Sequence, residues 1–465
     1  MDLLEKLINE QLLFNKMKKI LLVYLPFCTP ASPPYSITNL YSFLKNNCQN
    51  QIDVLDLNLE FHKLKFPEYQ KYYQSMNWDD YETKTKEYSK LTAKTYSENN
   101  KKVVNGEKPE FFEELLQKIM DKKPNIVAFS LVYSSQVFYA YSLIKELKQI
   151  ITVVGGPAVN EILMKTATKA LNSELELLDL LSKNKELNFN YNLDFSIYSL
   201  DEYFTPMPVI PIKTSSTCYY KQCAFCTHFA KTQYYESPVD VIKNTIIASQ
   251  QKLFFFIDDM LPSHRLLKIA DAMKPLNVKW SCQLKPTIDF DYNTLKRLRE
   301  SGLLSIFWGV ESGSDRILNL MKKGTNTKDI ENVLSDSHRA GIKNLLYIMF
   351  GFPTETKDEF LSTIEFMKKN EKNIDLVFPS IFGLQKGSIV YNDPEKFGLK
   401  KIIEEKRTVL EPKISFEIES GLTQKEAALL KKKYKKTING LNKYPKSMAF
   451  FREHMLCLAE MNGSI

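Results

Sequence analysis

No apolar run in the sequence is long enough to cross a membrane. The longest runs, such as Ile20-Leu21-Leu22-Val23-Tyr24-Leu25, have the length of a buried strand, whereas a membrane-spanning helix needs about 20 apolar residues. The acidic residues Asp2 and Glu5 precede this run, which argues against a secretory signal peptide. Repeats of solenoid period and low-complexity linkers are also absent. We therefore expect a globular protein without a membrane span.

Cysteine is scarce, odd in number and irregularly spaced. The 465 residues contain seven cysteines, which argues against the regular pairing of a disulfide-stabilised protein. Unpaired cysteines are typical of reducing compartments. We therefore predict a cytoplasmic location.

The excess of charge is small. Lys and Arg number 63 against 55 Asp and Glu, which gives a net charge of +8, and this balance does not indicate a nucleic-acid partner. The densest basic run is Lys431-Lys432-Lys433-Tyr434-Lys435-Lys436. It is predicted to be a solvated helix face, with contact to RNA or an acidic protein as the alternative.

The chain is long enough for two or three domains with sizeable cores. In its first part, strand-like runs alternate with helical patterns, which predicts a Rossmann-like parallel α/β sheet over residues 1–170. The expected strands are 19–25, 51–57, 125–130 and 151–154. Residues 60–108 are predicted to be a partly helical surface insertion with poorly defined structure, and Met1–Lys16 an amphipathic lead helix.

A second strand–helix rhythm covers residues 206–384, after a connector at 171–205. Its six units predict a partial parallel (β/α)6 barrel of the TIM type, whose active site lies at the carboxyl ends of the strands. The expected strands are 209–215, 253–257, 278–284, 304–310, 344–349 and 374–382. Residues 385–465 are predicted to be a mainly helical region, with helices at 423–441 and 446–461, that covers the barrel mouth and selects the substrate.

Three cysteines, Cys218, Cys223 and Cys226, lie within nine residues near the middle of the chain. Thiolates are soft ligands for iron–sulfur clusters and zinc, and short gaps let one loop surround a single centre. Three ligands without a fourth cysteine nearby favour a 4Fe-4S cluster with one iron left free. Zinc is the alternative, because His228 offers a fourth ligand.

This loop resembles the cluster loop of the radical S-adenosylmethionine (radical SAM) enzymes. Their usual gaps are three and then two residues, with an aromatic residue before the last cysteine. Phe225 holds the aromatic position and the second gap matches, whereas the first gap, of four residues, is one longer. The resemblance implies that S-adenosylmethionine binds the free iron and is cleaved to methionine and a 5′-deoxyadenosyl radical. It also implies an electron donor of the flavodoxin or ferredoxin type.

The first domain resembles the cobalamin-binding domain found in one branch of this superfamily. The matching segments are Val54–Asn58, Pro124–Ser130 and Val153–Pro157. The Asp-x-His-x-x-Gly loop that supplies an axial histidine in other cobalamin proteins is absent. The resemblance implies cobalamin at the strand ends marked by Ser130, Gly155 and Gly156. The alternatives are a domain that kept the fold without the cofactor, and a glycine pair that only makes a tight turn.

Further cofactor contacts are implied by two segments. Gly309-Val310-Glu311-Ser312-Gly313-Ser314 is similar to a family segment at the end of the fourth barrel strand, which implies that Glu311 and Ser312 contact S-adenosylmethionine. Gly351-Phe352-Pro353-Thr354-Glu355-Thr356 is similar to a loop that flanks the adenine, which implies roles for Gly351 and Pro353. Each segment is also a plausible helix start, with Ser314 or Thr356 as the cap.

Four other residues are candidates with open alternatives. Asp258 and Asp259 follow the second barrel strand, where relatives bind the methionine amino group, or they form a strand-end turn. Arg316 is a candidate for the cofactor carboxylate, or an ordinary surface arginine. Cys282 on the third barrel strand is a hydrogen-atom donor if it faces the barrel interior, or a buried inert thiol.

The leading prediction is a radical SAM enzyme that uses a 4Fe-4S cluster, S-adenosylmethionine and cobalamin. Its expected substrate is a peptide or a small natural-product intermediate, and C-methylation is the best-represented chemistry in the branch that it resembles. Rearrangement, epimerisation or cyclisation without methyl transfer is the first alternative. A non-catalytic metal-binding interaction protein is the second.

Overall fold

The computed structural model describes residues 18–182, 186–227 and 232–461. The chain divides into two compact units, each described here by itself. The first comprises the residues up to Met76, then Lys86–Pro206 and Arg407–Glu411. The second comprises Asn77–Thr85, Met207–Lys406 and the residues from Pro412 onward. The expected lead helix at Met1–Lys16 lies outside the described residues.

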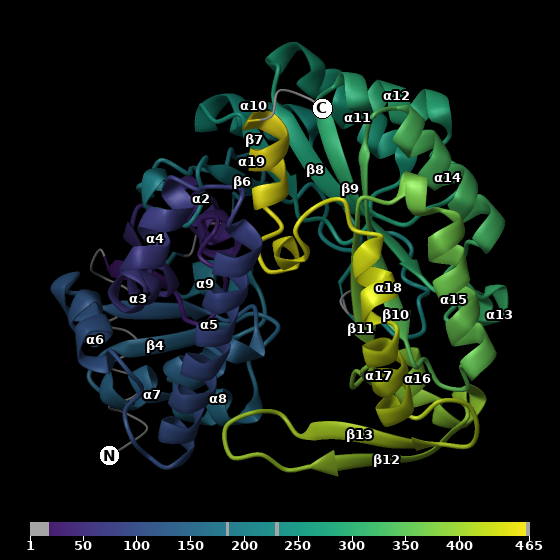
Figure 1. Ribbon diagram of the computed structural model, residues 1–465. Helices are drawn as coiled ribbons and strands as arrows, with labels where there is room; N and C mark the ends of the chain where they lie inside the picture. Colours follow the sequence, from purple (N-terminus) through teal and green to yellow (C-terminus); the bar gives the residue numbers. More distant parts are fainter. Residues whose placement is uncertain (1–17, 183–185, 228–231, 462–465) are drawn as a thin grey trace. The chain divides into compact units, whose positions relative to one another are not determined.

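A five-stranded parallel sheet forms the centre of the first unit, with the strand order β2-β1-β3-β4-β5 (Figure 1). Its strands are β1 (Lys19–Tyr24), β2 (Gln51–Asp56), β3 (Ile126–Ser130), β4 (Ile151–Gly155) and β5 (Lys169–Leu171). The Rossmann-like parallel sheet is thus confirmed. The three-residue β5 was not predicted, because so short a strand leaves no periodic pattern.

An apolar cluster joins this sheet to its helices. Ile20, Leu22 and Val153 of the strands pack in one buried cluster with residues of α2 (Tyr35–Asn47) and α9 (Glu174–Asp179). The remaining helices of the sheet are α6 (Phe112–Asp121), α7 (Val137–Glu146) and α8 (Glu161–Thr166).

The stretch predicted to be a loosely structured insertion folds into helices. These are α3 (Leu57–Lys65), α4 (Pro67–Gln74) and α5 (Tyr81–Val104). Aromatic side chains form their core, since Tyr88 lies 4.8 Å from Tyr69 and 5.2 Å from Phe66 between ring centroids. The tyrosines that made this stretch look polar therefore provide its buried surface.

A six-stranded parallel sheet in the order β11-β10-β9-β8-β7-β6 forms the second unit (Figure 1). Its strands are β6 (Val209–Ile212), β7 (Leu253–Phe256), β8 (Lys279–Leu284), β9 (Leu303–Glu311), β10 (Lys343–Phe350) and β11 (Leu376–Ile381). The helices along its outer face are α10 (Val239–Ser249), α11 (Ser263–Met273), α12 (Tyr292–Glu300), α14 (Thr327–Arg339) and α15 (Lys357–Lys369). The predicted partial barrel is confirmed.

Alternation along the strands separates two faces of this sheet. The outer face packs on the helices, since Trp280 donates to the carbonyl of Ser301 at the end of α12 (3.2 Å) and Phe350 lies 4.3 Å from Phe360 of α15. The inner face carries an aromatic layer with ring centroids 5.4–5.9 Å apart. Its members are Phe255, Phe307, Tyr347 and Phe378.

The C-terminal segment lies on this inner face. Arg452 holds its guanidinium 5.5 Å from the ring of Phe255 and donates a 2.8 Å hydrogen bond to the hydroxyl of Tyr347. The following helix, α19 (His454–Met461), contacts β8 and β9. Arg452 and α19 thus pack on the inner face of the barrel sheet.

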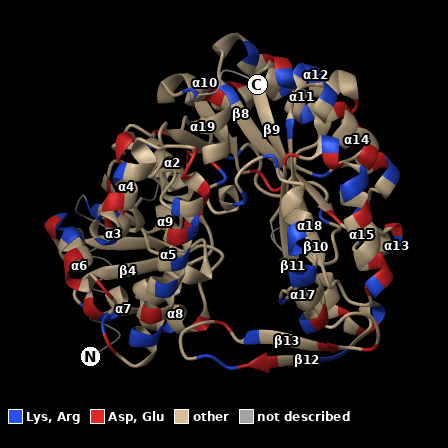
Figure 2. Ribbon diagram, in the orientation of Figure 1, with Lys and Arg blue, Asp and Glu red and all other residues tan. Residues whose placement is uncertain are grey.

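The rest of the C-terminal region is less helical than predicted. It begins with an antiparallel pair, β12 (Leu399–Glu405) and β13 (Lys413–Ile418). The lysine-rich helix divides into α17 (Gln424–Lys433) and α18 (Lys435–Gly440), and α17 packs against β10 and β11. Figure 2 shows its basic residues in blue. Among the described helices, none is both long and apolar enough to cross a membrane.

Candidate active site

The cysteine loop leaves β6 and is fixed at its start by Asp258. This buried carboxylate accepts hydrogen bonds from the backbone N–H groups of Thr214 (2.9 Å) and Ser215 (2.7 Å) and from the Ser215 hydroxyl (2.8 Å). Burial raises the pKa of Asp258 to about 6, although these hydrogen bonds oppose the rise. Asp258 therefore makes its hydrogen bonds to the loop itself. Its neighbour Asp259 is more exposed and lies 3.8 Å from Lys213.

The middle of the loop is fixed at three further points. Ala224 donates to the carbonyl of Met321 (2.8 Å), and Phe225 packs against an apolar cluster that includes Phe352. The Tyr220 hydroxyl donates to the carbonyl of Lys322 (2.8 Å). These contacts give the four-residue gap between the first two cysteines a defined path.

Two lysines contact aromatic rings of the cysteine loop, Lys285 at Tyr220 (3.1 Å to the ring centroid) and Lys323 at Phe225 (5.6 Å). Lys285 interacts electrostatically with Cys223 and Cys218, and Lys323 interacts with Cys223 and Cys226. Burial raises the pKa of the Cys223 thiol, and both lysines act in the opposite direction. Burial also lowers the pKa of Lys285 to about 8. Three thiols beside two cations fit a centre that carries negative charge, as a thiolate-bound cluster does.

The zinc alternative depends on His228, which lies outside the described residues. Within residues 18–182, 186–227 and 232–461, no three His, Cys, Asp or Glu side chains are grouped to hold one metal ion.

Glu311 ends β9 and forms an ion pair with Lys323, with 2.8 Å between Oε1 and Nζ. Both side chains are buried. Burial lowers the pKa of Lys323, but Glu311 and the nearby thiols more than offset this effect, so the pKa is raised overall. A Cβ on Gly309 would lie 2.8 Å from the Lys323 ammonium, so this glycine leaves the room that the ion pair occupies. Lys323 was not predicted, because two adjacent lysines in a polar turn show no distinguishing pattern.

The neighbouring Ser312 faces α15. Its hydroxyl accepts from the N–H of Ser314 (3.1 Å) and lies 3.3 Å from the hydroxyl of Thr363. A Cβ on Gly313 would lie 2.6 Å from the Cβ of Phe366, so the segment approaches the helix closely. The Ser312 side chain thus helps to hold this segment against α15.

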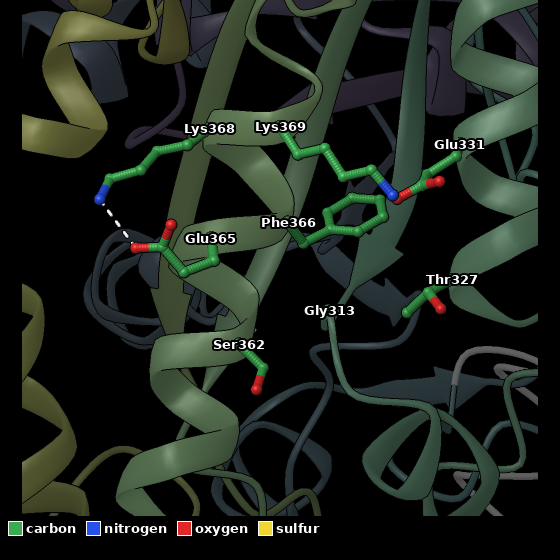
Figure 3. Close-up of a pocket in the computed structure, with 8 residues that line it drawn as sticks. All are labelled: Gly313, Thr327, Glu331, Ser362, Glu365, Phe366, Lys368 and Lys369. Carbon is green, nitrogen blue, oxygen red and sulfur yellow. Dashed lines mark hydrogen bonds and ion pairs between the residues drawn. The ribbon is translucent and has the colours of Figure 1, made fainter.

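Figure 3 shows the groove between α14 and α15 into which Gly313 faces. It has a volume of about 620 Å³. Its charged side chains pair with one another, Lys369 with Glu331 (2.7 Å) and Lys368 with Glu365 (2.8 Å). The groove lies between the outer helices. None of the predicted site residues lines it, and Gly313 is the one lining residue that belongs to the Gly309–Ser314 segment.

Arg316 forms hydrogen bonds to the loop that precedes α15 and to Glu359 of that helix. Its guanidinium makes two 2.6 Å hydrogen bonds to the Glu359 carboxylate and one of 2.8 Å to the carbonyl of Thr354. Burial opposes ionisation of Glu359, but Arg316 and Thr356 lower its pKa to about 2. Arg316 therefore fixes the segment that contains Gly351 and Pro353.

That segment turns sharply at Gly351, where φ is 73°. The Gly351 N–H donates to the carboxyl of Glu355 (2.5 Å). Glu355 is fully buried, and this burial raises its pKa to about 7. Pro353 is buried within the turn.

Cys282 is fully enclosed on β8. It shares the strand face of Trp280, which packs toward α12, whereas Ser281 and Gln283 point to the other side. The structure thus turns Cys282 toward the helices, contrary to the interior orientation that a hydrogen-atom donor requires. Burial raises the pKa of its thiol well above the usual range.

The predicted residues of the first unit lie at one edge of its sheet. Ser130 ends β3, with its hydroxyl 3.0 Å from that of Ser36 at the start of α2. Gly155 ends β4 and accepts from the N–H of Leu131 (2.8 Å). Gly156 has φ of 109°, and a Cβ there would lie 2.3 Å from the Leu131 carbonyl oxygen. This position therefore requires glycine.

Several known proteins resemble this chain. A sequence profile of the Radical SAM superfamily matches residues 212–367. An uncharacterized methyltransferase of Pyrococcus horikoshii is 26% identical over 332 residues, which cover 60% of this chain and 72% of the relative.

Two solved structures share the fold. The radical SAM methyltransferase TsrM from Kitasatospora setae, solved with cobalamin and a [4Fe-4S] cluster, superimposes with a TM-score of 0.56 at 14% identity, over 85% of this chain and 83% of TsrM. The cobalamin-dependent radical SAM enzyme OxsB gives a TM-score of 0.54 at 15% identity, over 82% of this chain and 56% of OxsB. The profile match covers the barrel from the end of β6 into α15, including the cysteine loop, and the fold of both units agrees with these neighbours. Residues 212–367, which include the cysteine loop and most of the barrel, therefore form a radical SAM domain.

Proposed function

We propose that this protein is a cobalamin-dependent radical SAM enzyme that methylates a carbon atom of a peptide or a small natural-product intermediate. The observation that carries the proposal is the arrangement of Cys218, Cys223 and Cys226 at the carboxyl end of the barrel sheet, beside the buried pair Glu311 and Lys323. When bound there, a 4Fe-4S cluster supplies the electron that breaks a carbon–sulfur bond of S-adenosylmethionine.

The three cysteines are the ligands that we assign to the cluster. Asp258, Ala224 and Tyr220 hold their loop in shape through the contacts described above. These contacts fix the path of the loop backbone, so that cluster binding has only the three cysteine side chains to bring together.

Glu311 and Lys323 are the residues that we assign to the methionine part of S-adenosylmethionine. This part carries an ammonium and a carboxylate, and a carboxylate next to an ammonium is the complementary charge pattern. Phe225 lies 5.6 Å from the Lys323 ammonium and offers an apolar surface nearby. Asp259, which lies 3.8 Å from Lys213, is a further candidate contact at the edge of the same sheet. The turn with Gly351 and Pro353 is our candidate for the adenine.

The first unit is the proposed site of cobalamin. Its strand order 2-1-3-4-5 is the doubly wound order in which ligands bind at the carboxyl edge, where the connection direction reverses between β1 and β3. Ser130 ends β3 at this point, and Gly155 and Gly156 leave the end of β4 without side chains. These features fit a large planar ligand. When bound, cobalamin supplies a carrier for the methyl group.

The proposed methyl transfer is supported by the names of the relatives. TsrM and the Pyrococcus protein are both called methyltransferases. We expect a flavodoxin- or ferredoxin-type protein as the electron donor.

Anaerobic reconstitution tests the proposal. The full chain is loaded with iron, sulfide and hydroxocobalamin and then given S-adenosylmethionine and dithionite. We expect about four irons per chain, retained corrinoid and release of 5′-deoxyadenosine. Changing Cys218, Cys223 or Cys226 to Ala is expected to abolish nucleoside release, whereas Cys48→Ala, at a cysteine packed in the first unit, serves as the matched control. Equal iron content and nucleoside release in Cys223→Ala would refute the cluster assignment.

A further inference from the structure

Lys285 is a buried cation beside the cysteine loop. It follows β8, and only 5% of its surface is exposed. Its backbone N–H donates to the Met260 sulfur (3.0 Å), which fixes the start of the side chain. Its ammonium lies 3.1 Å from the ring centroid of Tyr220, so the cation rests on the face of an aromatic ring.

Tyr220 holds its position because its hydroxyl donates to the carbonyl of Lys322. The ring also lies against Gly324, where φ is 67° and a Cβ would come within 2.2 Å of the Tyr220 hydroxyl. A glycine is needed there for both reasons. The ring on which Lys285 rests is therefore fixed from two sides.

The two lysines at the cysteine loop differ in how their charge is balanced. Lys323 has the carboxylate of Glu311 at 2.8 Å. In the described part of the chain, no carboxylate lies within ion-pair distance of the Lys285 ammonium, and Asp289 acts on it only from farther away. A buried cation without a counter-charge is unfavourable. The groups near it that carry negative charge when metal is bound are the thiolates of Cys218 and Cys223.

We propose that Lys285 is the positioning residue that raises the reduction potential of the cluster, with Tyr220 holding its ammonium against the cysteine loop. Reduction adds one electron to the cluster, so its charge becomes more negative by one. A fixed cation that rests on the cysteine loop and acts electrostatically on two of the three ligands stabilises that reduced state relative to the oxidised one. The electron comes from the flavodoxin- or ferredoxin-type donor, or from dithionite in the test. The inference rests on the proposed function, because it requires the cluster.

The test compares the midpoint potential of the reconstituted cluster in full-length variants, measured by an electron paramagnetic resonance titration with dithionite. Lys285→Met removes the charge while keeping a flexible chain of similar length. It is expected to disfavour the reduced state about tenfold, which for one electron is about 59 mV toward lower potential. Lys285→Arg, which keeps the charge, is expected to stay close to the wild type.

Lys322→Met is the matched control. Lys322 accepts the Tyr220 hydrogen bond through its backbone carbonyl and bears the same charge as Lys285, but its side chain is exposed, so water and salt screen it. Its substitution is expected to leave the potential near that of the wild type. Tyr220→Leu keeps the ammonium but removes the ring beneath it, and it is expected to lower the potential by less than Lys285→Met.

An unchanged potential in Lys285→Met overturns the inference while leaving the proposed function in place. If Lys285→Met assembles no cluster, Tyr220→Leu decides, and an unchanged potential in that variant overturns the inference. A wild-type chain that takes up no 4Fe-4S cluster overturns the proposed function as well.

Discussion

Glu311 and Lys323 form a buried ion pair 2.8 Å long at the end of β9, twelve residues apart in the chain. Glu311 has φ of 67°, in the left-handed region that non-glycine residues rarely adopt. A strained backbone and a buried carboxylate–ammonium pair at one strand end mark a place where the fold favours charge placement over local stability. This pair is our proposed contact for the methionine part of S-adenosylmethionine.

Removing one member of this pair is expected to destabilise the protein. Glu311→Gln leaves the Lys323 ammonium buried without its carboxylate, which typically costs about 3–5 kcal/mol. Urea titration of the apoprotein measures the free energy of unfolding. The double variant Glu311→Gln with Lys323→Met is the control, since it removes both charges and is expected to recover part of the loss. An apoprotein as stable as the wild type after Glu311→Gln would contradict the prediction.

Asp258 is expected to be required for cluster assembly although it is not a ligand. Asp258→Ala removes the acceptor for two backbone N–H groups and one hydroxyl at the start of the cysteine loop. We expect a clear decrease in iron and sulfide bound after reconstitution. Asp259→Asn, a change at the adjacent and more exposed carboxylate, is expected to keep the wild-type content. Equal iron content in Asp258→Ala and Asp259→Asn would show that the loop does not depend on this carboxylate.

Arg316 and Lys323 are expected to differ in their effect on S-adenosylmethionine. Arg316→Gln breaks the paired hydrogen bonds to Glu359, which, at a half-exposed site, costs about 1 kcal/mol of stability. It should weaken the binding of S-adenosylmethionine to the cluster-loaded protein less than Lys323→Met does. Isothermal titration calorimetry gives the two dissociation constants. A larger loss of affinity in Arg316→Gln than in Lys323→Met would contradict this assignment and favour Arg316 as the residue that binds the carboxylate of S-adenosylmethionine.

The buried carboxyl of Glu355 predicts a dependence of stability on pH. Burial raises its pKa from 4.5 to about 7, so the folded state holds the proton more tightly than the unfolded state. This contribution is fully present below about pH 4.5 and is lost as the pH rises through about 7, with a total of about 3 kcal/mol. Glu355→Gln stays neutral and lacks this loss. Thermal unfolding between pH 5 and pH 8 should therefore show the variant gaining stability relative to the wild type, and parallel curves would exclude the effect.

The two parallel sheets were predictable because their strands are long apolar runs separated by helical patterns. Ten of the eleven strands of these sheets were expected close to their observed positions, and only the short β5 was missed. The hairpin β12–β13 was not recognised because β12 shows no regular alternation of apolar and charged residues, which left β13 without a recognisable partner strand. The helices of residues 57–104 looked loosely ordered because their core is built from tyrosines rather than aliphatic residues.

Candidate site residues could be proposed from the sequence only where chemistry depends on residue type in a short segment. Cys218, Cys223 and Cys226 were proposed as cluster ligands from their residue type, their spacing and the resemblance of their loop to that of the radical SAM enzymes. Lys285 and Lys323 could not, because a lysine in a turn carries no local signal of burial, and their role depends on strands and loops that meet only in the folded barrel. Arg316 and Ser312 are the opposite case. Both were candidates for cofactor contact from the sequence, but Arg316 pairs with Glu359 of α15 and Ser312 lies against Thr363 of the same helix.

The segment with Arg452 and α19 follows all six strands of the barrel sheet in the sequence, and Arg452 contacts the aromatic layer at Phe255, Phe307 and Tyr347. During synthesis on the ribosome, this layer emerges well before the helix that contacts the same face of the sheet. Phe255 and Phe307 of the nascent barrel therefore stay exposed until this segment has been synthesised. Exposed apolar surface of this kind is prone to aggregation and is bound by chaperones.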